Sequence, residues 1–117
     1  MKIKTKRIYD PPEESDGYRI LVDRLWPRGL KKDKAKIDRW VKDIAPSKEL
    51  RTWYGHDPKK WQEFREWYFD QLDAKRDLVQ EMVKEGKGKQ ITLLFSAKNE
   101  QLNNAVCLKE YIDSKLG

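Results

Sequence analysis

The residues best suited to chemistry lie in the segment DGYRILVDRLWPRG, residues 16–29. An apolar run typical of a strand leads directly into charged, aromatic and turn-forming residues, and loops at strand ends commonly carry binding sites. Arg24 and Arg28 offer guanidinium groups that bind a carboxylate or phosphate through two parallel hydrogen bonds, and Trp26 lies between them. These residue types predict an anion site, but they do not identify a reaction.

A second polar group follows the apolar run QITLLF, residues 90–95. If strands over 18–23 and 90–95 are parallel neighbours, their carboxyl ends bring the two groups together, where open α/β sheets bind ligands. We expect Asn99 to cap the helix that follows, whose free N–H groups would help to hold an anion. The predicted ligand-binding residues are Arg24, Trp26, Arg28, Ser96, Lys98 and Asn99.

Asp23 and Tyr18 are predicted to support this site. Nearby positive charge favours an ionised carboxylate, so we expect Asp23 to orient an arginine rather than to act as a general base. The competing interpretation is purely structural: Arg24 pairs with Asp23 or a nearby Glu, Trp26 packs under its loop, and Asn99 is only a cap. The sequence leaves both interpretations open.

Other reactive residue types are more typical of structural roles. His56 next to Asp57 could transfer protons, but Asp57 before Pro58 is the pattern of a helix start, which places His56 on the surface. Cys107 lies in an apolar helical stretch and is expected in the core, and Ser96 lacks the GxSxG turn of a hydrolase. With one Cys and one His in the chain, we expect no metal and no cofactor. Catalytic residues stay unknown, and the sequence does not decide between a binding protein and an enzyme.

The elements that position these residues follow from hydrophobic spacing. Residues 2–8 alternate in polarity and predict a strand at an outer position of the sheet. The runs over 18–23 and 90–95 predict strands that are covered on both faces.

Helices are expected between the strands. Apolar residues at i, i+3, i+4 and i+7 predict a helix over 37–44, and Ser47 then caps a further turn up to residue 54. One long or two shorter helices follow from Pro58 to Gly86, and a last helix spans 102–112. The predicted fold is a single α/β domain over residues 1–117, with a small, mainly parallel sheet and helices packed on its faces.

Charge and aromatic content suggest three classes of partner. The net charge of +6 is concentrated before residue 61 and could attract a small anionic ligand, possibly phosphorylated, or nucleic acid, although many proteins are lysine-rich only for solubility. Aromatic residues at 53, 54, 61, 67 and 68 could stack on bases, but their helical spacing is more typical of a core. An exposed Trp patch would instead indicate a protein partner. No run approaches the roughly 18 apolar residues of a membrane span, so we expect a cytoplasmic protein; its oligomeric state stays open.

Several segments resemble a known family. They are KRIYDPPEESDGYRILVDRLWPRG at 6–29, WVKDIAPSKEL at 40–50, FREWY at 64–68 and LLFSAKNEQLNNAVCL at 93–108. Together they are similar to the YeaO-like family, domain of unknown function 488. The resemblance implies a small bacterial or archaeal cytosolic α/β protein with no established activity. Longer relatives carry Cys and His after the last strand, where this chain has Asn103, Asn104 and Ala105, which argues against thiol or metal chemistry here.

Overall fold

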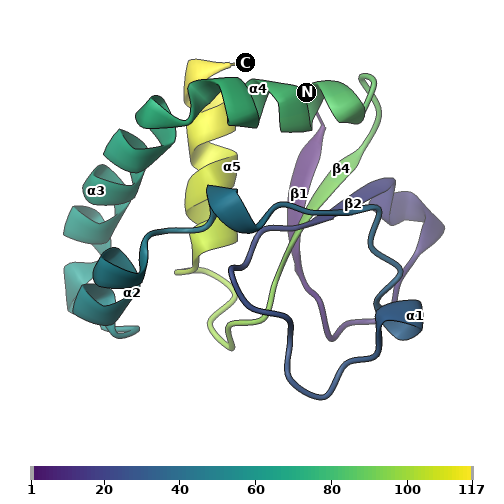
Figure 1. The fold of residues 1–117 in the computed structure, drawn as a ribbon, viewed down its shortest axis with the longest axis horizontal. Helices are drawn as coiled ribbons and strands as arrows, with labels where there is room; N and C mark the ends of the chain where they lie inside the picture. Colours follow the sequence, from purple (N-terminus) through teal and green to yellow (C-terminus); the bar gives the residue numbers. More distant parts are fainter. Residues whose placement is uncertain (1, 117) are drawn as a thin grey trace.

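Four parallel strands form the centre of the structure, a computed structural model that describes residues 2–116 (Figure 1). Their order across the sheet is β1 (Ile3–Arg7), β4 (Ile91–Phe95), β2 (Tyr18–Leu21) and β3 (Arg39–Trp40). Every pair of neighbours is parallel. This arrangement confirms the predicted α/β class, the outer position of the N-terminal strand and the pairing of β2 with β4.

The register of β2 and β4 brings their carboxyl ends to the same level. Tyr18 pairs with Ile91 and Leu21 with Leu94, and the Val22 N–H still donates to the Leu94 carbonyl at 3.1 Å. The residues that follow each strand therefore emerge side by side. This register places the loop after residue 22 against the loop after residue 95.

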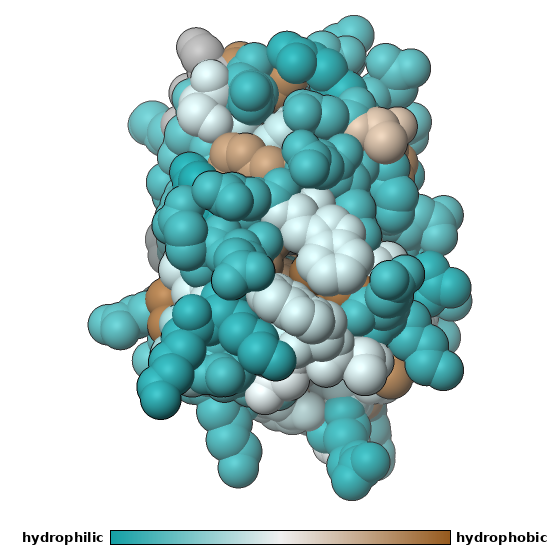
Figure 2. All heavy atoms as spheres, turned by 90° about the vertical axis from the view of Figure 1, so that its left-hand side faces the viewer, coloured by the Kyte–Doolittle hydropathy of each residue, from teal (hydrophilic) through white to brown (hydrophobic). Residues whose placement is uncertain are grey.

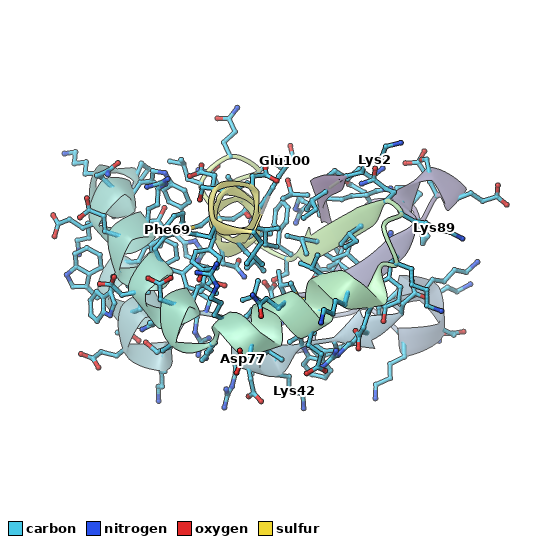
Figure 3. All side chains as sticks on the ribbon, turned by 90° about the horizontal axis from the view of Figure 1, so that it is seen from above. Lys2, Lys42, Phe69, Asp77, Lys89 and Glu100 are labelled. Carbon is cyan, nitrogen blue, oxygen red and sulfur yellow. The ribbon has the colours of Figure 1, made fainter. Side chains whose placement is uncertain are left out.

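Helices cover one face of this sheet. They are α2 (Lys48–Tyr54), α3 (Trp61–Ala74), α4 (Arg76–Glu85) and α5 (Asn104–Lys115). Their buried side chains form the main core with alternate residues of the strands, such as Ile20 and Leu93. Seen from above, α5 is viewed end-on between α3 and the strands, and Phe69 points toward it (Figure 3). The ring of Phe69 packs edge-on against Tyr111 of α5, with 5.3 Å between centroids.

The other face is covered by a long loop and the short helix α1 (Lys32–Ala35). Leu21 and Leu94 point to this side and form a smaller cluster with Ile8 and Ala35, flanked by Trp26, Leu30, Ile37 and Trp40. The remaining ordered turns are the 3-10 helices η1 (Glu14–Asp16), η2 (Lys42–Ile44) and η3 (Pro58–Lys60). Because β2 and β4 have apolar neighbours on both sides, their continuous apolar runs are explained.

The predicted helix over 37–44 is wrong. Its apolar residues do not share one face: Ile37 and Trp40 pack on the smaller cluster, whereas Val41 and Ile44 lie in the main core. The chain runs between the two faces as strand β3, where the Val41 N–H donates to the Leu21 carbonyl at 3.0 Å. Pairing with β2 therefore overrides the helical spacing. The sequence patterns did not predict the short helix α1 either. It lies in the loop that covers the second face of the sheet, ahead of β3.

Several local predictions are confirmed. The Ser47 hydroxyl accepts a hydrogen bond from the Leu50 N–H at 3.1 Å and caps α2. Asp57 accepts from the Lys59 N–H at 3.0 Å ahead of Pro58. The segment from 58 to 86 contains two helices that meet at Lys75.

A buried ion cluster supports the start of β2, and the sequence patterns did not predict it. The Asp16 side chain is fully buried and lies 2.5 Å from Arg19, 3.0 Å from Lys4 and 3.1 Å from Lys6. Burial alone would raise the pKa of the Asp16 carboxyl group, but the N–H of Glu13 and the three cationic side chains hold that pKa well below its usual value.

Arg19 extends this cluster to α1. Its guanidinium group donates to the carbonyls of Ala35 at 2.8 Å and Lys36 at 3.0 Å. Asp16 therefore connects the first strand, the second strand and the loop that covers the second face.

Candidate functional site

A pocket of about 480 Å³ opens where β2 and β4 end and α5 begins. Its wall comes from five parts of the chain: Tyr9 after β1, residues 23–28 after β2, the region from Ala45 to His56, Phe64 of α3, and residues near the ends of the 96–104 segment. Ligands of open α/β sheets bind at this edge, beyond the carboxyl ends of the strands. The parallel register of β2 and β4 is what brings these parts together.

Asp23 joins the two strand ends. Its Oδ2 accepts hydrogen bonds from the Ser96 N–H at 2.8 Å and the Ser96 hydroxyl at 2.7 Å. Its Oδ1 accepts from the Asn104 amide at 3.1 Å, and that amide also donates to the Val22 carbonyl. Both carboxylate oxygens are therefore occupied by groups of the protein itself.

The predicted pairing of Asp23 with an arginine is wrong. Within residues 2–116, the ion pair of Arg24 is with Asp43, at 3.7 Å between two exposed side chains. Because β4 lies beside β2, Ser96 at the end of β4 is close enough to donate hydrogen bonds to Asp23. Asp23 therefore binds a residue distant in sequence and not the adjacent arginine.

Three arginines line the pocket: Arg24, Arg28 and Arg51. Among the residues that the structure describes, Arg28 and Arg51 form no ion pair. The Arg28 backbone is anchored, because its carbonyl accepts a hydrogen bond from the Tyr9 hydroxyl at 2.9 Å. Because the lining holds three arginines and one carboxylate, Asp23, its net formal charge is positive.

The sequence reasoning missed Arg51. It lies in α2, about 25 residues from the DRLWPRG segment, and nothing in its local pattern distinguishes it from other surface arginines. His56 also lines the pocket, on the surface, as expected for a residue at a helix start. Gly55 and His56 adopt successive left-handed conformations, with φ of 52° and 57°, which turn the chain after α2 toward the pocket.

Aromatic and apolar side chains form the base of the pocket. Tyr54 and Phe64 are buried, with 4.4 Å between their ring centroids, and buried Ala45 and Pro46 lie beside them in the lining. The Tyr54 hydroxyl donates to the Leu102 carbonyl at 3.4 Å. The base is thus continuous with the main core, and the charged groups belong to the more exposed wall.

Trp26 has both structural and lining roles. Its indole N–H donates to the Leu30 carbonyl at 2.6 Å, and its ring meets Trp40 edge-on at 5.4 Å. It packs under its own loop, as the structural interpretation expected, and it also lines the pocket.

The structure brings Asp23, Arg24, Trp26, Arg28 and Ser96 together at the pocket. Their role in ligand binding stays a prediction. Lys98 and Asn99 are not in the lining, because the chain continues past them before α5 begins.

Asn99 does not cap the last helix, and that prediction is wrong. Its side chain accepts from the N–H groups of Gln101 and Leu102, at 2.9 Å each, and so closes a turn before the helix. Asn103 is the cap of α5, since its side chain accepts from the Val106 N–H at 2.9 Å.

Tyr18 lies at the opposite end of β2 from the pocket. Its hydroxyl donates to Glu85 at 3.2 Å, at the end of α4. Burial, together with the negative charge of Glu85, raises the pKa of this hydroxyl. Tyr18 therefore supports the contact between β2 and α4 rather than the pocket, which contradicts its predicted supporting role.

Cys107 is a core residue, as predicted. It is fully buried, and burial raises the pKa of its thiol to about 12.

The structure groups no three His, Cys, Asp or Glu side chains that could hold a metal ion within residues 2–116. None of the helices in that same range is long and apolar enough to cross a membrane.

The aromatic residues of α2 and α3 belong largely to the core. Tyr54 and Tyr68 are buried, and Trp53, Trp61 and Trp67 are partly buried against the same cluster. On the side where these helices lie, Figure 2 shows a pale area of near-neutral hydropathy within a hydrophilic surface. The two rings of Trp53 and Trp67 are 5.6 Å apart. They pack mainly on each other and on the core.

Comparison with known proteins gives a consistent result. The family model described as "Inactive DUF488-N3 subclade" matches residues 2–117. The chain is 45% identical over 114 residues to the uncharacterized protein YeaO of Escherichia coli (strain K12), covering 97% of this chain and 99% of the relative. It is also 45% identical over 71 residues to the uncharacterized protein Rv3073c of Mycobacterium tuberculosis (strain ATCC 25618 / H37Rv), covering 61% of this chain and 60% of that protein. No solved structure matches.

Proposed function

Because this chain belongs to the DUF488 family, in its inactive N3 subclade, we propose that it binds a small anion in the pocket at the ends of β2 and β4 and does not transform it. One observation carries the proposal. Arg24, Arg28 and Arg51 line a pocket whose one carboxylate, Asp23, is already bound by Ser96 and Asn104. An anion would complete the hydrogen bonding of the Arg28 and Arg51 guanidinium groups, which form no ion pair among the described residues.

The start of α5 supports the same proposal. Leu102, Asn103 and Asn104 line the pocket, so the first turn of this 12-residue helix lies at its edge. Helix N-termini carry partial positive charge and favour anions. The arginines and the helix thus act in the same direction.

The chemistry of the lining favours binding over catalysis. The thiol of Cys107 is buried in the core, away from the lining. The Ser96 hydroxyl is held by Asp23, which also accepts the Ser96 N–H, so this contact fixes the loop. The description of the subclade as inactive agrees with this interpretation.

Thermal unfolding in the presence of inorganic phosphate tests the proposal. An anion at about a hundred times its dissociation constant adds roughly 2.7 kcal/mol to the free energy of unfolding, which raises the Tm by several degrees in a domain of this size. Arg28→Ala and Arg51→Ala should lose most of that increase. Arg76→Ala is the matched control, because Arg76 is exposed and donates to the Lys115 carbonyl, outside the pocket. Equal increases in all variants, or no increase with phosphate, sulfate or a carboxylate, would overturn the proposal.

A basic loop favours nucleic acid as a second candidate. The loop that covers the second face, residues 22–38, exposes six cations and two carboxylates: Arg24, Arg28, Lys31, Lys32, Lys34, Lys36, Asp33 and Asp38. Such a surface attracts the phosphate backbone of a nucleic acid without reading the base sequence.

A protein-partner role has less support, because the large hydrophobic side chains exposed within residues 2–116 are only Tyr9 and Leu25.

A further inference from the structure

We infer that the pocket is suited to a phosphate monoester whose organic part carries an aromatic ring, the chemistry of a nucleoside monophosphate. This inference rests on the anion binding proposed above and specifies the class of ligand. Three features of the lining carry it: its charge, its size with its largely aromatic floor, and the exposed ring of Tyr9 at its rim.

The charge of the lining favours a dianion over a monoanion. The three arginines contribute three positive charges and Asp23 contributes one negative charge, so the formal balance of the lining is two positive charges, which the exposed pairing of Arg24 with Asp43 offsets in part. A phosphate monoester carries about −1.5 to −2 near neutral pH, whereas a carboxylate carries one negative charge. Phosphate also offers three oxygen acceptors to guanidinium groups that come from two different elements, the loop after β2 and α2.

The size of the pocket requires more than a lone anion. Its volume of about 480 Å³ lies within the range of roughly 300–1,000 Å³ typical of sites for organic ligands. An inorganic phosphate held by the arginines would leave the floor of the pocket unfilled. That floor contains Tyr54, Phe64, Ala45 and Pro46, and an aromatic ring packs favourably against such apolar and aromatic side chains.

Tyr9 provides a further ring at the rim. It is 41% exposed, yet it is held in place, since its hydroxyl donates to the Arg28 carbonyl and the Arg7 guanidinium lies 5.2 Å from its ring centroid. Arg7 is itself bound to the Ala97 carbonyl at 3.0 Å. A positioned, exposed ring bound to the backbone of Arg28 is the arrangement that a ligand with both a phosphate and a ring requires.

The polar groups of the lining predict weak discrimination between bases. Asp23, Ser96, Asn103 and Asn104 all use their side chains in hydrogen bonds within the protein, so that, apart from the arginines, the exposed imidazole of His56 is the main polar side chain left for a base. Reading one base against another needs free donors and acceptors that match its edge. Recognition should therefore depend on the phosphate and on stacking, with similar affinities for adenosine and guanosine monophosphate.

Isothermal titration calorimetry of the full chain with inorganic phosphate, adenosine and adenosine monophosphate tests the inference. We expect the monophosphate to bind at least about fivefold more tightly than inorganic phosphate, since stacking on an aromatic side chain contributes at least that factor, and adenosine to bind more weakly than either. Ribose 5-phosphate should resemble inorganic phosphate. A 5′-phosphorylated oligonucleotide distinguishes a strand end from a free nucleotide as the source of the ligand.

Substitutions at Tyr9 separate its ring from its hydrogen bond. Tyr9→Leu should reduce the preference for adenosine monophosphate over inorganic phosphate, and Tyr9→Phe should retain it; far-ultraviolet circular dichroism checks that both variants fold. If phosphate binds but the monophosphate binds no more tightly, the inference is wrong and the proposed anion site stands. If neither binds, both are wrong. An unchanged preference in Tyr9→Leu would overturn the role of the rim.

Discussion

At the scale of single residues, two carboxylates have environments and partners that their neighbours in sequence do not predict. Asp16 lies in an exposed, loop-like stretch of the sequence, yet it is the fully buried centre of an ion cluster with Lys4, Lys6 and Arg19. Asp23 precedes an arginine, yet it binds Ser96 and Asn104. In both cases the partners arrive from other strands or helices. Asp16 connects two strands and the loop on the second face through its ion pairs, and Asp23 fixes the strand ends that line the pocket.

Replacing Asp16 by Asn should destabilise the protein strongly. The substitution leaves three buried or half-buried cations facing a neutral amide, and breaking a buried ion pair typically costs about 3–5 kcal/mol. Urea denaturation at neutral pH measures the effect. Asp33→Asn is the control, because Asp33 is exposed on α1 and should change the free energy of unfolding by less than about 0.5 kcal/mol. A cost below 1 kcal/mol for Asp16→Asn would contradict the structural role of the cluster.

Asp16 also predicts how stability depends on acid. Its pKa is lower in the folded protein than in the unfolded chain, so its contribution is fully present above the unfolded value of about 4 and declines as the pH falls from there toward the folded value. We expect the urea midpoint of the wild type to fall below about pH 5. The Asp16→Asn variant should show a shallower fall over the same range. Parallel curves for the two proteins would contradict this assignment.

At the scale of elements, the carboxyl ends of β2 and β4 and the first turn of α5 act as one unit. Asn104 joins them by donating to both the Val22 carbonyl and Asp23, while Asn103 caps the helix. The residues that line the pocket from this unit are therefore held by backbone and side-chain hydrogen bonds before any ligand arrives. Such preorganisation would lower the entropy cost of binding the proposed anion.

The cap of α5 gives a prediction at this scale. Asn103→Ala should lower the free energy of unfolding by about 1 kcal/mol, as loss of a helix cap typically does, whereas Asn99→Ala should cost less because Asn99 closes only an exposed turn. Urea denaturation compares the two matched variants. Hydrogen exchange should become faster in the first turn of α5 only in Asn103→Ala. A larger cost at Asn99 would show that the helix is capped differently.

At the scale of the whole molecule, the two faces of the sheet are covered by different kinds of structure. Helices cover one face, and the loop that carries most of the exposed cations of the first half covers the other. The pocket lies at the edge between them. A long anionic polymer could therefore contact the basic loop while its terminal phosphate reaches the pocket.

Salt dependence distinguishes the loop from the pocket. If an oligonucleotide binds along the loop, its binding constant should fall steeply between low and moderate salt, with a slope that grows by about 0.9 for each phosphate contacted on a duplex. Replacing Lys31 and Lys34 by Gln should flatten that slope by up to about two. A flat salt response, or a slope that the double variant leaves unchanged, would exclude binding through the loop.

Much of the fold follows from the sequence because local spacing reports burial. Continuous apolar runs identified β2 and β4, and caps at Ser47 and Asp57 located the starts of helical segments. The helix over 37–44 failed because its apolar residues serve two different faces. Spacing along a chain cannot show which side of a sheet each residue will meet.

For the pocket, the sequence by itself determined the segments that line it at the strand ends: Arg24, Trp26 and Arg28 after one strand and Ser96 after its neighbour. Only the tertiary structure decided which residues complete it. Arg51 and Tyr9 join the pocket, and Lys98 and Asn99 do not. The physical reason is that pairing in the sheet places a strand and the residues directly after it, and the local pattern of apolar residues reveals such strands. Packing of the core decides which distant helix comes to lie beside the strand ends, and no local pattern reports that.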